Sequence, residues 1–134
     1  MQLPALQIVA QRFHSDCSVA CLAMVCGVRY EVALGAFDHN VCMDGATLPQ
    51  IQRAAKRLKV PLTYHWRRLQ ALLDDITGIL DLEMKGEKHN HLVVVHGDHI
   101  IDVDPEHPSL WDYDVYMEAY KFKPVGLLMR RERK

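Results

Sequence analysis

The pattern of apolar and polar positions changes character near the middle of the chain. Residues 17–27 carry one polar side chain besides cysteine, Ser18, so this stretch predicts a helix that is apolar on nearly all sides. Such a helix is expected to be central and buried. Ser15 or Asp16 precedes it as a candidate N-cap, and Gly27 is a candidate stop.

Further helices are predicted before the midpoint of the chain. A short one is expected at about residues 30–37. Segment 44–60 then opens with a turn, and Thr47 and Gln50 have the spacing of a capping box. An apolar stripe at helical spacing follows, made of Leu48, Ile51, Ala55 and Leu58. The pattern therefore indicates a well-capped amphipathic helix in this segment.

The second half of the chain has mainly the pattern of strands. Strand-like runs separated by turn residues occupy residues 60–66, 78–84, 91–97, 99–104 and 125–131. Two short helices are predicted among them, at 67–76 and around Trp111–Tyr120, the second capped by Ser109 or Asp112. Since helices come first and an antiparallel sheet second, the predicted fold class is α+β. No linker or repeat interrupts the chain, and we expect residues 1–134 to form a single domain.

The composition is that of an ordinary globular protein, with 49% apolar and 25% charged residues. The formal net charge of −1 gives no reason to expect nucleic acid as a partner. The longest apolar run, Val19–Val25, is far shorter than the roughly 20 residues of a membrane span, and Met1–Ala10 lacks the features of a signal peptide. We therefore expect a cytoplasmic protein without a membrane-spanning segment, and the sequence does not fix its oligomeric state.

The cysteine pattern favours free thiols over disulfides or a metal site. The four cysteines are Cys17, Cys21, Cys26 and Cys42. Three of them share one segment, and without signs of export reduced thiols are expected. A zinc site built on Cys17 and Cys21 would lack the usual spacing of ligands. Weaker metal candidates are two histidine pairs, His89 with His91 and His96 with His99. No metal or other cofactor is therefore predicted.

Cys17 stands at the first turn of the predicted buried helix, where its chemistry changes. A helix N-terminus carries partial positive charge and unpaired N–H groups, which stabilise a thiolate and can also bind a developing oxyanion. Gln11, six residues earlier, could supply a second oxyanion donor through its side-chain amide. Taken alone, Cys17 is better explained as a small hydrophobic residue, as are Cys21 and Cys26 deeper in the helix.

Asp16 complicates the chemistry of Cys17, because a carboxylate beside a thiolate repels it. If the Asp16 side chain caps the helix, its charge is compensated by backbone N–H groups instead. We expect the cap. Cys42 falls in a predicted loop and has no assigned role.

A base for Cys17 has to be chosen from eight histidines, and hairpin geometry selects one. Gly97-Asp98 is a good two-residue turn, which makes His96 face His99 across the hairpin. Continuing this register places His91 opposite Asp104, close enough for an imidazole–carboxylate hydrogen bond. Asp102 is the alternative partner, one step along the same face. A solvent-facing polar pair without function fits the same pattern.

These residues occur in the order of a papain-like cysteine peptidase: Gln11, Cys17, His91 and Asp104. More specifically, the sequence resembles the C39 peptidase family, the leader-cleaving domains of bacteriocin-exporting transporters and their stand-alone relatives. The similar motifs are "QRFHSDCSVACLAM" at 11–24, "DGATLPQIQRAAKRLKV" at 44–60, "NHLVVV" at 90–95 and "VDP" at 103–105.

The resemblance implies a papain-like fold in which the cysteine helix packs on the antiparallel sheet. It also implies that Cys17 is the nucleophile, His91 the base, Asp104 the residue orienting the base, and Gln11 the oxyanion donor. The substrate would then be a peptide or protein, with cleavage after Gly-Gly as the family expectation. Ser18 departs from the family, which usually has glycine there.

The resemblance leaves other functions open. No transporter segment follows in the sequence, so a free-standing enzyme is expected. The alternatives are a catalytically weak domain that binds peptides in the same groove, and acyl transfer or deamidation by the same residues. Retention of all four functional residue types favours an enzyme.

Overall fold

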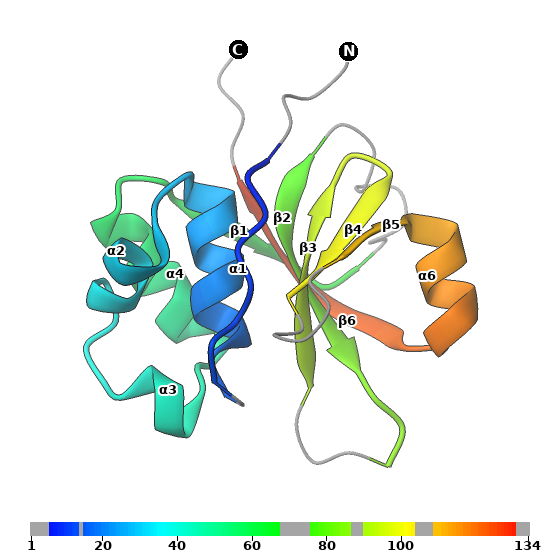
Figure 1. Ribbon diagram of the computed structural model, residues 1–134, viewed down its shortest axis with the longest axis horizontal. Helices are drawn as coiled ribbons and strands as arrows, with labels where there is room; N and C mark the ends of the chain where they lie inside the picture. The colour runs from blue at the N-terminus through cyan, green and yellow to red at the C-terminus, as the bar shows by residue number, and fades with distance from the viewer. Residues whose placement is uncertain (1–5, 14, 68–75, 87–89, 104–108, 131–134) are drawn as a thin grey trace.

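The computed structural model describes residues 6–13, 15–67, 76–86, 90–103 and 109–130 (Figure 1). Its centre is a six-stranded sheet in the order β1-β6-β2-β3-β4-β5, and every neighbouring pair of strands is antiparallel. Figure 1 shows α1 to α4 on one face of this sheet and α6 on the other. The predicted α+β class, with N-terminal helices packed on an antiparallel sheet, is confirmed.

The bounds of most elements follow the sequence patterns, but the short helix at 41–44 and the strand at 109–112 were not predicted. The helices are α1 (Cys17–Cys26), α2 (Tyr30–Gly35), α3 (Val41–Asp44), α4 (Leu48–Arg57) and α6 (Tyr113–Tyr120). The strands are β1 (Leu62–His65), β2 (Thr77–Glu83), β3 (His91–His96), β4 (His99–Asp102), β5 (Ser109–Asp112) and β6 (Lys123–Arg130). None of the helices in these described segments combines the length and apolar character that crossing a membrane requires.

Helix α1 is the buried centre of the helical layer, as its apolar sequence predicts. Residues 18–25 are each at most 2% exposed. The helix packs against α2 and against strands β2 and β3. Gly27 ends it in the left-handed conformation, with φ at 69°, which a residue without Cβ adopts at little cost.

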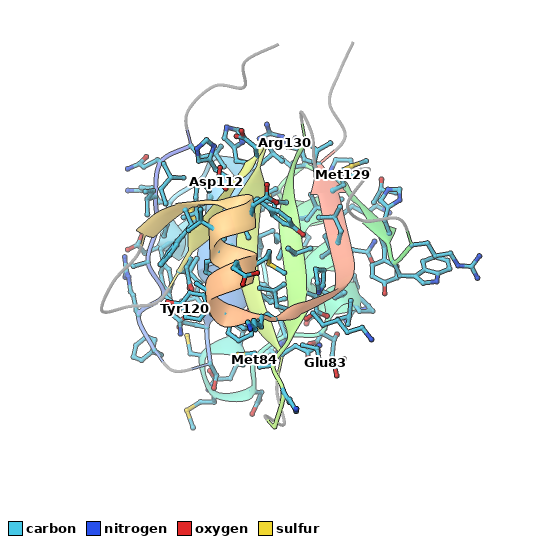
Figure 2. The ribbon with its side chains drawn as sticks, turned by 90° about the vertical axis from the view of Figure 1, so that its right-hand side faces the viewer. Glu83, Met84, Asp112, Tyr120, Met129 and Arg130 are labelled. Carbon is cyan, nitrogen blue, oxygen red and sulfur yellow. The ribbon has the colours of Figure 1, made fainter. Side chains whose placement is uncertain are left out.

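Two hydrophobic cores lie on the two faces of the sheet. The strand side chains that face α1–α4 include Ile79, Leu92, Val94 and Ile101. Those that face α6 include Leu80, Val93, Val95 and Ile100. Figure 2 shows α6 lying across this second face between Asp112 and Tyr120. Strands β2 to β4 are thus covered on both sides, which explains their almost continuous apolar runs.

Two of the local sequence signals are confirmed in detail. The backbone N–H of Gln50 donates to Thr47 Oγ1 at 3.3 Å, and the backbone N–H of Thr47 donates to Gln50 Oε1 at 2.8 Å. These two hydrogen bonds complete the capping box of α4. The β3–β4 hairpin has the predicted register, with His96 opposite His99 and Val95 opposite Ile100.

Other expectations are wrong or lie outside the described residues. Cys42 lies in the short helix α3 rather than in a loop. Trp111 belongs to strand β5, not to a helix, because β5 pairs with β4, a contact that no local pattern reveals. Of the two candidate caps, Asp112 is the one that precedes α6. Its carboxylate accepts the backbone N–H groups of Asp114 and Val115. The helix predicted at 67–76 falls almost entirely outside the described residues.

Candidate active site

The start of α1, the start of β3 and the end of β4 bring three predicted site residues together. Cys17 is the first residue of α1 and is partly exposed. His91 is the first residue of β3 and Asp102 the last of β4. A buried helix and a hairpin of the central sheet therefore hold these side chains, and both supports are rigid elements of the core.

His91 and Asp102 form a hydrogen-bonded ion pair. His91 Nε2 donates to Asp102 Oδ1 at 2.9 Å, and the two side chains are only 21% and 14% exposed. Because Asp102 occupies Nε2, Nδ1 is the ring nitrogen that remains for the Cys17 thiol, which contributes to the raised pKa of His91. The order thiol, imidazole, carboxylate is the arrangement of a nucleophile, its base and the group that orients the base.

The surroundings of His91 favour its charged form. Burial acts to lower the pKa of His91, but hydrogen bonds to Asp102 and Cys17, together with the charges of both, raise it from 6.5 to about 9. An imidazolium beside a thiol stabilises the thiolate, which is the nucleophilic form. The site therefore holds a charged imidazolium at neutral pH.

Asp104, the partner predicted from the hairpin register, lies outside the described residues. The confirmed part of that register ends at the pair Val94 and Ile101. His91 forms its hydrogen bond with Asp102, the alternative partner.

Gln11 lies in the segment before α1 and is 8% exposed. Its backbone N–H donates to the carbonyl of Val103 at 2.9 Å, next to Asp102. Its side-chain Nε2 donates to the carbonyl of Phe13 at 2.7 Å. The predicted oxyanion donor is thus fixed both to the hairpin that carries Asp102 and to its own loop.

The Asp16 side chain does not cap α1, so the expected cap is wrong. Its carboxylate instead accepts the backbone N–H groups of Arg12 and Phe13, each at 2.9 Å, and the hydroxyl of Tyr30. The backbone of Asp16 (φ −107°, ψ 24°) lacks the extended conformation typical of side-chain caps, which explains why the carboxylate turns back. Asp16 is completely buried and holds the loop of Gln11 in place.

Ser18, where the family motif has glycine, is also completely buried. Its hydroxyl has no hydrogen-bond partner among the described residues. Cys21, one turn further along α1, is buried too, and burial followed by the nearby Cys17 and Asp102 charges raises the pKa of its thiol. Cys21 is therefore unsuited to act as the nucleophile.

Tyr116 is a site residue that sequence reasoning missed. Its hydroxyl donates to Asp102 Oδ2 at 2.8 Å, on the oxygen not used by His91. An aromatic residue in a short helix carries no local signal for such a contact, which depends on how α6 packs on the sheet.

Comparison with protein-family models assigns the sequence to a known family. Residues 5–107 match the model of the peptidase C39 family. The chain belongs to the peptidase C39 family. A search of the curated proteins found no match. Membership in the C39 family indicates, in general terms, a cysteine peptidase acting on peptide substrates. Helix α6 and strand β6 lie beyond the part of the chain that matches the family model.

The raised pKa of His91 predicts a pH-dependent stability. Since its folded-state value of about 9 exceeds the ordinary 6.5, the stabilising contribution is complete below about pH 6.5 and is lost as the pH rises through about 9. We expect the difference in unfolding free energy between the wild type and His91→Gln to shrink by about 2 kcal/mol from pH 6 to 9.5, allowing for solvent screening. Urea denaturation at several pH values measures it.

The matched control for this titration is His99→Gln. His99 also contacts a carboxylate, Asp98, but both side chains are well exposed at 47% and 75%. Its substitution should change the unfolding free energy by less than about 1 kcal/mol. If the difference in unfolding free energy between the wild type and His91→Gln stays constant from pH 6 to 9.5, the raised pKa of His91 is contradicted.

Proposed function

We propose that this C39 family chain is a cysteine peptidase that cleaves peptide bonds with Cys17 as nucleophile and His91 as base. Asp102 orients and charges His91, and Gln11 contributes to the oxyanion hole. The observation that carries the proposal is the 2.9 Å hydrogen bond from His91 to Asp102, with the Cys17 thiol contributing to the raised pKa of His91. Asp104, which the sequence predicts as the residue orienting His91, is the alternative to Asp102 in this role.

The proposed reaction proceeds through an acyl-enzyme. The Cys17 thiolate attacks the carbonyl carbon of the substrate, forming a C–S bond and a tetrahedral oxyanion. His91 then gives its proton to the leaving amine as the C–N bond breaks. In the second half His91 takes a proton from water, which attacks the thioester and releases the acid and the thiolate.

The oxyanion of the tetrahedral intermediate needs donors that are already in place. The N–H groups of Cys17 and Ser18 come before the first hydrogen bond of α1, which the Val19 N–H donates to the carbonyl of Asp16 at 3.0 Å. In this proposal they lie beside the reacting carbon. The Gln11 side chain supplies the second donor in this proposal. Its hydrogen bonds to Phe13 and Val103 support the role, because they limit how far the loop can move.

The first test is the rate at which iodoacetamide alkylates each cysteine between pH 4 and 9, with peptide mass mapping to identify the thiol. We expect Cys17 to react fast at pH 6, and His91→Ala to slow that reaction about 30-fold, towards an ordinary thiol of pKa about 8.5. Cys21 and Cys26 are internal controls, since burial raises the pKa of both thiols, that of Cys26 to about 11 despite the opposing charge of Arg130.

The alternatives give different outcomes in the same experiments. If the alkylation of Cys17 remains slow until pH 8 and its rate is the same in His91→Ala, the nucleophile assignment fails. A peptide-binding domain then becomes the better explanation. If Cys17 is reactive, Gly-Gly peptides are the first substrates to try. Release of a free acid by water indicates hydrolysis, whereas transfer to an added amine or release of ammonia from glutamine indicates the acyltransferase or deamidase alternative.

A further inference from the structure

Helix α6 covers the face of the sheet opposite to α1 (Figures 1 and 2). One of its side chains nevertheless contacts the candidate active site. The Tyr116 hydroxyl donates to Asp102 Oδ2 at 2.8 Å, while His91 Nε2 donates to Oδ1 at 2.9 Å. The carboxylate is thus held from both sides, with one oxygen bound to each partner.

The packing of Tyr116 fixes the position of its hydroxyl. The side chain is completely buried, and it is among the largest of the fully buried side chains. Its ring contacts those of Trp111, Tyr120 and Phe122, with centroids 5.6, 4.8 and 6.2 Å away. Trp111 comes from the edge strand β5 and Phe122 follows α6, so the ring is enclosed by several segments.

We propose that Tyr116 is a positioning residue, which holds Asp102 in the rotamer that presents Oδ1 to His91 Nε2. A donor that is fixed in the core and bound to Oδ2 restrains rotation of the carboxylate about its Cβ–Cγ bond. Tyr116 is buried and does not touch a substrate, so it acts only through Asp102. The inference rests on the proposed role of His91 as the base.

The hydroxyl of Tyr116 is suited to this task because it stays protonated. Burial, followed by the charge of Asp102 and the hydrogen bond to it, raises the pKa of Tyr116 above its ordinary value of 10. Tyr116 therefore remains a donor over the whole range in which His91 titrates. A hydrogen bond to a carboxylate that is only 14% exposed is also stronger than one in water.

The test is Tyr116→Phe, which removes one hydroxyl and keeps the ring. Following the His91 ring protons by NMR against pH, we expect the midpoint of its titration to fall by about half a pH unit or more. Alkylation of Cys17 by iodoacetamide at pH 6 should slow about fivefold in the wild-type background, and less than about twofold in the Asp102→Asn background. Tyr120→Phe, in the same helix and cluster but 45% exposed, is the matched control and should change neither.

Each other outcome overturns the inference. An unchanged midpoint means that the hydroxyl does not act on His91, and a raised midpoint means that it only withdraws charge from Asp102. Equal slowing in both backgrounds means a general effect on packing. Should Tyr116→Phe fail to fold, p-aminophenylalanine at position 116 keeps a weaker donor. A lowered midpoint is then expected, and an unchanged one counts against Tyr116.

Failure of the proposed function is distinguishable from failure of this inference. If His91→Ala leaves the alkylation of Cys17 unchanged, His91 is not the base. The NMR titration of His91 still reports whether Tyr116 orients its carboxylate.

Discussion

Asparagine in place of Asp102 is expected to lower kcat/KM for peptide hydrolysis by about 1,000-fold. The substitution keeps the shape of the side chain but removes the negative charge that stabilises the imidazolium. The pKa of His91 should fall from about 9 towards 6.5, and the ring loses its fixed orientation. Initial rates on the best Gly-Gly peptide measure the loss, and circular dichroism checks that the variant is folded.

The matched control for Asp102 is Asp104→Asn, at the position that the hairpin register selected. If Asp102 is the partner of His91, as its 2.9 Å hydrogen bond indicates, Asp104→Asn should retain activity within about threefold. A large loss with Asp104→Asn and a small one with Asp102→Asn would return the orienting role to Asp104.

Alanine in place of Asp16 is expected to lower the free energy of unfolding by about 4 kcal/mol. The carboxylate is completely buried and accepts from the N–H groups of Arg12 and Phe13 and from the hydroxyl of Tyr30. Its removal leaves these three donors without their acceptor, and a donor left unpaired in the interior costs about 1–3 kcal/mol. Urea denaturation of the wild type and the variant measures the change.

Asp44→Ala provides the comparison for Asp16, because Asp44 is exposed on the short helix α3. It should change stability by less than about 0.5 kcal/mol. If Asp16→Ala costs less than about 1 kcal/mol, the loop of Gln11 is not held by this carboxylate. A folded Asp16→Ala protein would also show whether the loop affects catalysis separately from stability.

The parts of the site that the sequence predicts are those set by local geometry. Cys17 could be singled out from the sequence because the apolar pattern marks where the buried helix begins. The first residue of a helix lies in the partial positive charge of the helix N-terminus. The register that leads to His91 follows from the turn at Gly97, which adopts the left-handed conformation, with φ at 62°, that such a turn requires. Neither inference depends on how distant segments pack.

The parts that sequence reasoning misses depend on contacts between distant segments. The Asp16 carboxylate accepts the hydroxyl of Tyr30, fourteen residues away, a contact that no local pattern reveals. Strand β5 exists because β4 pairs with it, and Tyr116 reaches Asp102 because α6 then folds back over the sheet. The choice between Asp102 and Asp104 is of the same kind, since both lie on one face of a predicted strand.

The position of β6 in the sheet has a consequence for the order in which the chain folds. This strand, residues 123–130, lies between β1 and β2, and β6 is the one neighbour of β1 among the strands that the structure describes. Arg130 at its end also donates to the carbonyl of Val25 at 3.0 Å, joining it to α1 across 105 residues of sequence. During synthesis, residues 62–65 must therefore wait for nearly the whole chain before they can pair. Helix α1 is made early, whereas β1 can join the sheet only after β6 has been made.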